Sequence, residues 1–501
     1  MSWLVKIEKA LFYFLVFAGF WQWRVVWLPA ELSSALPAKL SLALAGQQFN
    51  EWTVFSLYAT DLVVAAIFIL WAWRIIYKKR LVSNPPKAEL SSGQPSLKGG
   101  SDSPPLGGVR GDFDYGKITL YMFLLFCALS LFVASDKMLA LFRFIKLLEF
   151  VGLYFYVRYN FAGLYSLKKI WQWFIAGAAL QSMVAIAQFL TQQSLGLKFF
   201  AESPLAPNLA GVAKIVVAGE KIIRAYGLVP HPNILAAMLI MAIFGLVWLF
   251  LTNKFVIPAE AGIQDSGSRI KCGMTQRRIG VLLFIVIFAL LSIALFVTFS
   301  RGVIIIGGVL FFAWLIYLWR NSKESRKPIV FICVILFLVS CFLFLVFRPY
   351  VSARYDPASL AGSQSVDLRS FYNQEAIKMI WQKPLLGLGL GNFVPALKQT
   401  ASLPLWQYQP AHNIYLLIAA EVGLLALLAF LVFLFLTVRS VWKFRRDLAV
   451  SCLLFAVGCL LFFGLFDHFL WDLQQGQILF WLMLGLLGAH SSMDRAQASE
   501  A

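Results

Sequence analysis

Three side chains in this sequence could act on a phosphorylated substrate: Arg224, Arg301 and His412. An imidazole exchanges protons near neutral pH, so His412 is a candidate general base. Arginine is permanently charged, and its planar fork of donors matches phosphate oxygens. Arg301 is therefore a candidate ligand for a pyrophosphate, and Arg224 is a second arginine that could carry function. Each of the three lies close to a long apolar segment, so those segments decide whether the side chains can meet.

The apolar segments indicate an all-α, polytopic membrane protein. The chain has 501 residues, of which 60% are hydrophobic and 13% charged, which is too apolar for a soluble globular domain. A membrane-spanning helix needs about 20 apolar residues. We expect about twelve spans, at residues 10–28, 52–73, 118–134, 138–157, 170–193, 231–253, 279–298, 302–319, 328–347, 412–438, 448–466 and 471–489.

The distribution of basic residues predicts the orientation of these spans. With the N-terminus in the cytoplasm, 27 of the 43 Lys and Arg residues fall in cytoplasmic segments and 13 in outer ones. The short loops alternate between basic and neutral, as the positive-inside rule requires. The formal net charge of +19 is therefore mainly a signal of orientation. Because the basic residues are dispersed over alternating loops, we expect no nucleic-acid partner.

Arg301 occupies the most costly of the candidate positions. It interrupts an apolar run from 281 to 319, where only a very short turn on the outer face is available. An arginine at a helix end can serve as a topological anchor, but the positive-inside rule disfavours a lone arginine on this face. Ser300 and Gly302 allow close approach at a helix N-terminus, which favours anions. We therefore interpret Arg301 as an anion ligand.

Arg224 and His231 precede the sixth span on the same face. A solvated loop charge is the simpler interpretation of Arg224, because it lies in a polar segment. However, Gly227 and the Pro-His-Pro-Asn stretch at 230–233 suggest a structured return to the membrane, where loop residues often carry function. His231 is a further candidate for substrate binding.

His412 opens the tenth span, directly after the longest outer segment. A lone histidine there could be an ordinary interfacial residue, but the adjacent Asn413 and the later Glu421 strengthen the functional interpretation. Nine residues extend about 13–14 Å along a helix, so Glu421 should bond to a neighbouring helix instead of to His412. Asn413 is a further candidate for substrate binding.

The last outer loop holds another candidate, His468, between Asp467 and Asp472. No pair of histidines or carboxylates on this face has the helical spacing of metal ligands, and no glycine-rich phosphate loop is present. We therefore expect no metal and no cofactor. A periplasm lacks ATP, so the donor must arrive already activated.

The segments between the spans differ in character. Residues 84–114 and 254–278 are expected to be cytoplasmic inserts, and 491–501 a disordered tail. The outer segment 348–411 is too long to be structureless without a function. Within it, apolar residues at helical spacing over 366–378 predict a helix on the membrane surface, and Pro384 with the glycines that follow predicts a tight loop.

Together these motifs resemble the O-antigen ligase family, also called the polymerase/ligase superfamily. The matching pieces are residues 298–302, Arg224 followed by 231–233, Arg369 followed by 384–389, and 412–415 with Glu421 and Gly423. The resemblance covers most of the integral domain at 1–490, with the core motifs at about 224–430. The twelve spans and the long loop between the ninth and tenth spans also fit.

The resemblance implies a GT-C-like membrane glycosyltransferase in the bacterial inner membrane. Such an enzyme moves a glycan from an undecaprenyl-pyrophosphate-linked donor to a lipid-anchored or glycan acceptor, such as lipid A-core, at the periplasmic face, without metal or nucleotide. Arg224 and Arg301 would hold the pyrophosphate, and His412 would act as base on the acceptor hydroxyl or orient it. Arg369 would assist donor or acceptor binding, with His231, Asn413 and His468 as further candidates. Inversion at the anomeric carbon is expected.

Other functions fit parts of the pattern. A polysaccharide polymerase or a protein O-oligosaccharyltransferase would share the donor chemistry and differ in the acceptor. A lipid-linked glycan transporter should show two similar halves and ionisable residues near the bilayer midplane, whereas the costly residues here gather at one face. A purely structural membrane protein would not need Arg301.

Overall fold

A computed structural model of the chain describes residues 2–27, 51–83, 115–252, 267–355 and 360–500. The described chain is mainly helical, as the composition predicts, with two short antiparallel hairpins. Strand β1 (Arg24–Trp27) pairs with β2 (Phe55–Tyr58), and β3 (Lys214–Val217) pairs with β4 (Glu220–Ile223).

The helices are α1 (Ser2–Ala18), α4 (Ala59–Ser83), α5 (Tyr115–Val133), α6 (Lys137–Leu164), α7 (Leu167–Thr191), α8 (Pro232–Thr252), α9 (Gly267–Val297), α10 (Arg301–Asn321), α11 (Arg326–Val346), α12 (Arg348–Tyr355), α13 (Leu360–Gln382), α14 (Phe393–Thr400), α15 (Ile414–Val422), α16 (Leu424–Val441), α17 (Leu448–Phe463), α18 (Phe469–Asp472) and α19 (Gln474–Glu500).

The described part of the chain contains eight helices that are long and apolar enough to cross a membrane. They lie in α4, α5, α7, α8, α9, α10, α11 and α16. The count is smaller than the expected twelve because α1 and α17 are shorter and α6 carries Arg143, Lys146 and Glu149. In addition, α19 begins with three glutamines in its first four residues.

Two expected spans have different boundaries in the structure. The first, expected at 10–28, ends at Ala18, and its apolar continuation forms strand β1 instead. The tenth, expected at 412–438, is divided at Gly423 into α15 and α16. Gly423 has a φ of 95°, and a Cβ added there would lie 1.9 Å from the carbonyl oxygen of Leu385. A side chain is therefore excluded, and only glycine fits this break.

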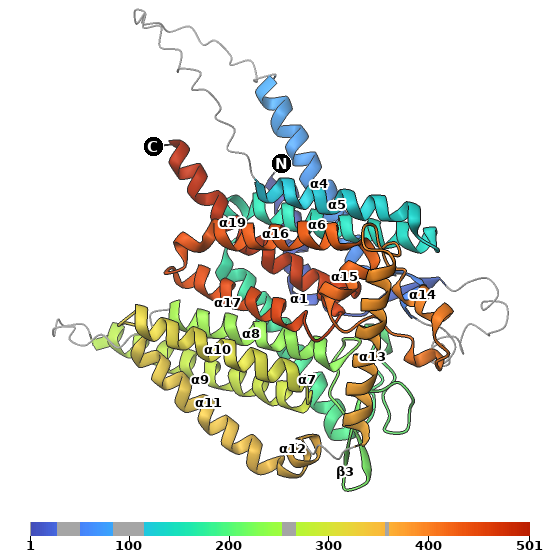
Figure 1. The fold of residues 1–501 in the computed structure, drawn as a ribbon. Coiled ribbons are helices and arrows are strands. Elements are labelled where there is room, and N and C mark those ends of the chain that lie inside the picture. The colour runs from blue at the N-terminus through green and yellow to red at the C-terminus, as the bar shows by residue number, and fades with distance from the viewer. Residues whose placement is uncertain (1, 28–50, 84–114, 253–266, 356–359, 501) are drawn as a thin grey trace, which may run out of the picture.

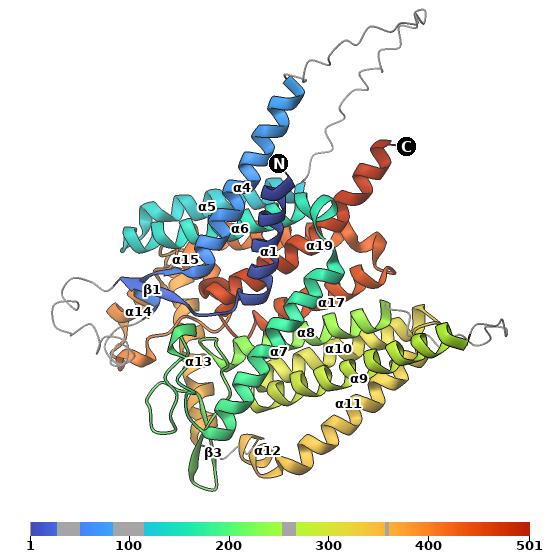
Figure 2. The same ribbon diagram turned by 180° about the vertical axis from the view of Figure 1, so that it is seen from behind.

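The helices form two groups that run roughly side by side (Figures 1 and 2). In one group α19 packs on α6 and α16 packs on α5, and in the other α8, α9, α10 and α11 lie together. Helix α17 contacts α8, α10 and α19, so it connects the groups. Helix α8 is apolar around its whole circumference, and 94% of its most apolar stretch is buried. Such a helix belongs at the centre of a bundle.

The long segment 348–411 is largely helical, with α12, α13 and α14 in it. The surface helix expected at 366–378 is present as the longer α13, which passes across the ends of the other helices in both views. The tight glycine loop is also present, because Gly387, Gly389 and Gly391 all have positive φ. The bundle end that α13 crosses is called the site end below.

The expected inserts and tail are described only in part. Residues 84–114 and 253–266 lie outside the described chain, whereas α9 already begins at Gly267. Helix α19 continues to Glu500, so most of the expected disordered tail is helical in the structure. The C-terminal part of α19 lies at the bundle end opposite the site end (Figure 1).

Candidate active site

The turn that carries Arg301 is strained and held by aromatic packing. Phe299 has a φ of 47°, a left-handed conformation that costs a residue with a side chain about 1–2 kcal/mol. Its ring packs against Phe189 and Tyr350, with ring centroids 5.8 and 6.1 Å apart. The turn ends α9 and starts α10 at Arg301, so it places the partly exposed Arg301 at a helix N-terminus.

The N-terminus of α10 has no side-chain cap and has open space beside it. Ser300 is its N-cap residue, but its side chain makes no capping bond and donates to Asn233 Oδ1 instead, at 2.7 Å. A Cβ added to Gly302 would meet no atom within 4 Å, so space is open beside the first turn. The N–H groups of a first helical turn and the positive end of the helix dipole both attract anions.

Arg224 is buried directly behind this turn. Its Nε donates to the Thr298 carbonyl oxygen at 2.6 Å, and its NH2 donates to Asn233 Oδ1 at 2.8 Å. The Arg224 side chain therefore fixes the turn that presents Arg301, and it adds a buried positive charge beneath it.

Asn233, in the first turn of α8, connects this turn to the last loop of the chain. Its Oδ1 accepts from Arg224 and Ser300, and its Nδ2 donates to Asp467 Oδ2 at 2.6 Å. Asp467 Oδ1 in turn accepts from the backbone N–H of His468 at 2.8 Å. One amide thus joins the ends of α8, α9, α10 and α17.

His412 lies beside this network with one ring nitrogen committed. Its Nδ1 lies 3.1 Å from the Pro410 carbonyl oxygen, which can only accept, so Nδ1 carries the proton. In the neutral ring, Nε2 then keeps its lone pair, as a general base requires. The ring stacks on Tyr372 of α13, with centroids 5.7 Å apart, and contacts the His468 ring edge-on at 4.8 Å.

The electrostatics of the site keep His231 and His412 neutral. Burial, followed by the neighbouring His468, lowers the pKa of His412 well below its usual range. Burial and the charge of Arg224 lower the pKa of His231 to about 3. Burial alone would raise the pKa of Asp467, but the surrounding imidazoles and Arg369 lower it instead. Neutral imidazoles can accept a proton, and an ionised carboxylate can stabilise the imidazolium that results.

The structure assigns different positions to the remaining candidates. Arg369 in α13 is partly exposed and close enough for its charge to act on His231, His412 and Asp467. The Nδ1 of His231 accepts from the backbone N–H of Asn233 at 3.2 Å, so that nitrogen stabilises a turn. Asn413 is the N-cap of α15, and its Oδ1 accepts from the N–H groups of Tyr415 and Leu416.

His468 lies between His412 and a carboxylate. Its Nδ1 lies 2.9 Å from Asp472 Oδ1, and its ring also contacts the Trp52 ring edge-on at 4.9 Å. The site end therefore brings together Arg224, His231, Asn233, Arg369, His412, Asp467 and His468.

Glu421 bonds to a neighbouring helix, as predicted. Its Oε2 accepts from Trp471 Nε1 of α18 at 2.9 Å. The glycine loop holds the adjacent backbone, because the N–H groups of Leu388 and Gly389 donate to the carbonyl oxygens of Ala420 and Glu421. The loop thereby closes the C-terminal end of α15, whose N-terminal end carries His412.

Residues 284–431 match the family model described as O-antigen ligase. The match indicates an O-antigen ligase domain in this part of the chain. A search of curated proteins gives no match. The matched segment includes Arg301, Arg369, His412, Glu421 and the glycine loop, so the motifs that carried the resemblance lie mostly within it. The matched domain indicates a membrane glycosyltransferase of the O-antigen ligase/polymerase type.

Sequence reasoning did not identify two residues of the hydrogen-bond network at the site end, Asn233 and Asp467. Asn233 was only part of a motif, and Asp467 was noted only as a neighbour of His468. The two are 234 residues apart, so no local spacing connects them. The available signal was that both polar residues adjoin long apolar runs, Asn233 at the start of one and Asp467 after the end of another, where unpaired polar groups are costly.

Among the described residues, no three His, Cys, Asp or Glu side chains form a group that could hold a metal ion. The metal-independent mechanism stays a prediction, as do the roles of the individual site residues.

Proposed function

We propose that the protein transfers a glycan from undecaprenyl pyrophosphate to an acceptor hydroxyl, with lipid A-core as the acceptor, at the periplasmic face of the inner membrane. The observation that carries this proposal is the tautomer of His412. The bond from its Nδ1 to the Pro410 carbonyl leaves Nε2 as an acceptor, beside a network that leads to Arg301.

The reaction is a single displacement at the anomeric carbon. The acceptor oxygen attacks this carbon while the bond from the carbon to the pyrophosphate oxygen breaks, and the acceptor proton passes to His412 Nε2. The products are the glycosylated acceptor with inverted configuration and undecaprenyl pyrophosphate. A positioned base contributes about 10²–10⁴-fold to the rate of such a step.

The departing pyrophosphate gains negative charge, so groups that stabilise that charge lower the barrier. Arg301 meets the pyrophosphate directly, together with the N–H groups of the first turn of α10. Arg224 acts from behind, by fixing the turn and by adding a charge that water does not screen. Arg369 reaches the same space from α13.

Transfer by purified protein in liposomes tests the proposal, with a lipid-pyrophosphate glycan as donor, rough-type lipopolysaccharide as acceptor and EDTA present. We expect His412→Ala and Arg301→Ala each to reduce the rate by at least about 100-fold. Arg320→Ala is the matched control, because Arg320 lies in the last turn of the same helix. Wild-type rates in the first two variants would contradict the proposal.

The identity of the product separates the related activities. A longer glycan that is still attached to the pyrophosphate carrier would make the enzyme a polymerase. Movement of intact donor across the membrane without transfer would make it a transporter.

A further inference from the structure

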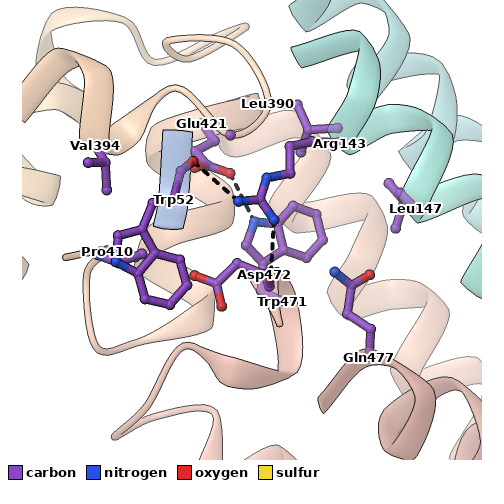
Figure 3. Close-up of a pocket in the computed structure, with 11 residues that line it drawn as sticks. Trp52, Arg143, Leu147, Leu390, Val394, Pro410, Glu421, Trp471, Asp472 and Gln477 are labelled. Atoms are coloured by element: carbon purple, nitrogen blue, oxygen red, sulfur yellow. Dashed lines mark hydrogen bonds between the residues drawn. The ribbon is translucent and has the colours of Figure 1, made fainter. Parts of the chain in front are cut away.

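A second polar region lies on the other side of His468 from Asn233. It consists of two adjoining hollows of about 30 Å³ each, both lined by Trp52, Arg143, Asp472 and Gln477. We call this region the Trp52 cleft. It lies between η1 (Glu51–Thr53), the first turns of α6 and the α18–α19 junction. Figure 3 shows Arg143, Glu421, Trp471 and Asp472 gathered around it.

The cleft contains buried polar groups whose bonding capacity is not used. Gln477 is only 6% exposed, and its side-chain amide bonds to none of the described residues. Figure 3 shows this amide turned toward the space beside Arg143. Asp472 Oδ2 and Gln474 Oε1 likewise find no partner in the described chain. Buried polar groups without hydrogen bonds are costly, so their presence indicates a site that a ligand completes.

The kinds of groups present indicate what the ligand is. Arg143 donates to the carbonyl oxygens of Asp472 and Trp52, at 2.9 and 3.2 Å, and keeps further N–H groups. The carboxylates of Glu421 and Asp472 line the same hollow, so the positive charge is offset there. Donors and acceptors thus alternate around the space. This arrangement suits neutral hydroxyl groups, each of which donates and accepts, better than an anion.

The cleft also offers an aromatic wall close to the base. The Trp52 ring contacts His468 edge-on at 4.9 Å, and His468 contacts His412 edge-on at 4.8 Å. A sugar has an apolar ring face and polar hydroxyls, which an indole beside hydrogen-bonding groups can match. A sugar in this cleft would lie one imidazole away from the proposed base.

We infer that the Trp52 cleft binds an acceptor sugar next to the one that supplies the attacking hydroxyl. Gln477, Asp472 and Arg143 bond to the hydroxyls of this sugar, and Trp52 covers one face of its ring. This assignment rests on the proposed function, because it gives the acceptor a place distinct from the donor site at Arg301.

Gln477→Leu tests the inference, because the Gln477 side chain supports no hydrogen bond within the described fold. Transfer is measured at varied concentrations of rough-type lipopolysaccharide and, separately, of donor. We expect the KM for the acceptor to rise about 3- to 10-fold, which corresponds to one lost hydrogen bond, while the KM for the donor stays within about twofold. Gln475→Leu is the matched control, because Gln475 is buried in the same turn and lines neither hollow.

A second measurement separates this inference from the proposed function. Binding of the deacylated core saccharide to purified protein is measured without donor, for wild type, Gln477→Leu and the milder Gln477→Asn. Weaker binding in the variants than in wild type supports the cleft even if no transfer occurs. An unchanged acceptor KM in an active Gln477→Leu enzyme, or equal saccharide binding in all three proteins, would show that the cleft holds only water.

Discussion

The two sides of His468 differ in how completely their polar groups are paired. On one side, the side-chain groups of Asn233 all have partners, in Arg224, Ser300 and Asp467. On the other, Gln477 and one oxygen of Asp472 have none among the described residues. A paired network fixes geometry in advance, as transition-state stabilisation requires. A set of polar groups without hydrogen-bond partners is instead a place where a substrate binds. The comparison therefore separates a rigid reaction site from a binding cleft.

The paired side should respond most strongly to substitution. Asn233→Leu removes a hydrogen-bonding partner from the buried Arg224 and Ser300 side chains and from the half-buried Asp467, and each such loss costs about 1–3 kcal/mol. We expect a loss of stability on the order of 3 kcal/mol or more, together with a transfer rate reduced at least about 100-fold. Thermal unfolding in detergent and the transfer assay measure the two effects.

The control for this substitution is Asn321→Leu, at the exposed far end of α10. It should change stability by less than about 0.5 kcal/mol. If Asn233→Leu changed stability as little as Asn321→Leu, the hydrogen bonds of Asn233 would not be what stabilises the turn between α9 and α10.

On the cleft side, Gly391→Ala should have a smaller effect. Gly391 has a φ of 74°, and a Cβ there would lie 2.6 Å from Cγ of Arg143. Alanine would strain the backbone by about 1–2 kcal/mol and would also displace Arg143. We expect weaker binding of the core saccharide, with the KM for the donor unchanged.

Gly196→Ala is the control that isolates the backbone strain expected in Gly391→Ala, because Gly196 has a similar φ of 83° and open space around it. The two variants should lose comparable stability, but only Gly391→Ala should lose acceptor binding. Equal saccharide binding in both would mean that Arg143 does not contribute to the cleft.

Asn413→Ala should affect the fold more than the chemistry. The substitution removes the N-cap of α15, which costs about 1 kcal/mol. We expect a lower Tm and an acceptor KM within about twofold of wild type. A large rise in either KM would instead favour the direct substrate contact that the sequence suggested.

The smallest effect should come from pH. Because the pKa of His412 lies well below 6.5, its imidazole is neutral and able to accept a proton at every pH above that value. Transfer should therefore vary less than about twofold between pH 8 and 6.5, whereas a base with an ordinary histidine pKa would be half protonated at about 6.5. A half-loss of activity at pH 6.5 or above would argue against a buried His412 as the base.

The sequence predicted the residues that are costly in a membrane setting, and not their partners. Arg301 and His412 were found because a charge or imidazole interrupts an apolar run. The pairing of Asn233 with Asp467 depends on how α8 and α17 pack, which the spacing of residues in the sequence does not reveal. His468 and Asp472, in contrast, are only four residues apart.

The sequence also failed to predict some helix boundaries, because these too depend on contacts between distant segments. The break at Gly423 was missed because glycine does not interrupt an apolar pattern, and it is the approach of the Leu385 backbone that requires it. The end of α1 at Ala18 was missed because residues 21–27 are also apolar in part, so strand and helix could not be separated there. The surface helix and the glycine loop were found, because helical spacing and glycine runs are local signals.

The bonds between the glycine loop and the α15–α16 break also determine which parts of the protein could be exchanged between relatives. The Leu424 N–H donates to the Pro384 carbonyl oxygen, and the Leu388 N–H donates to that of Ala420. Residues 384–392 and 420–424 therefore form one unit, although they are separated in the chain by α14 and by the histidine. A chimaera that replaced the long loop alone would contain a loop from one protein and an α15–α16 break from another, so the hydrogen bonds between the two segments would not be matched. Transplanting a new specificity requires exchange of both segments together.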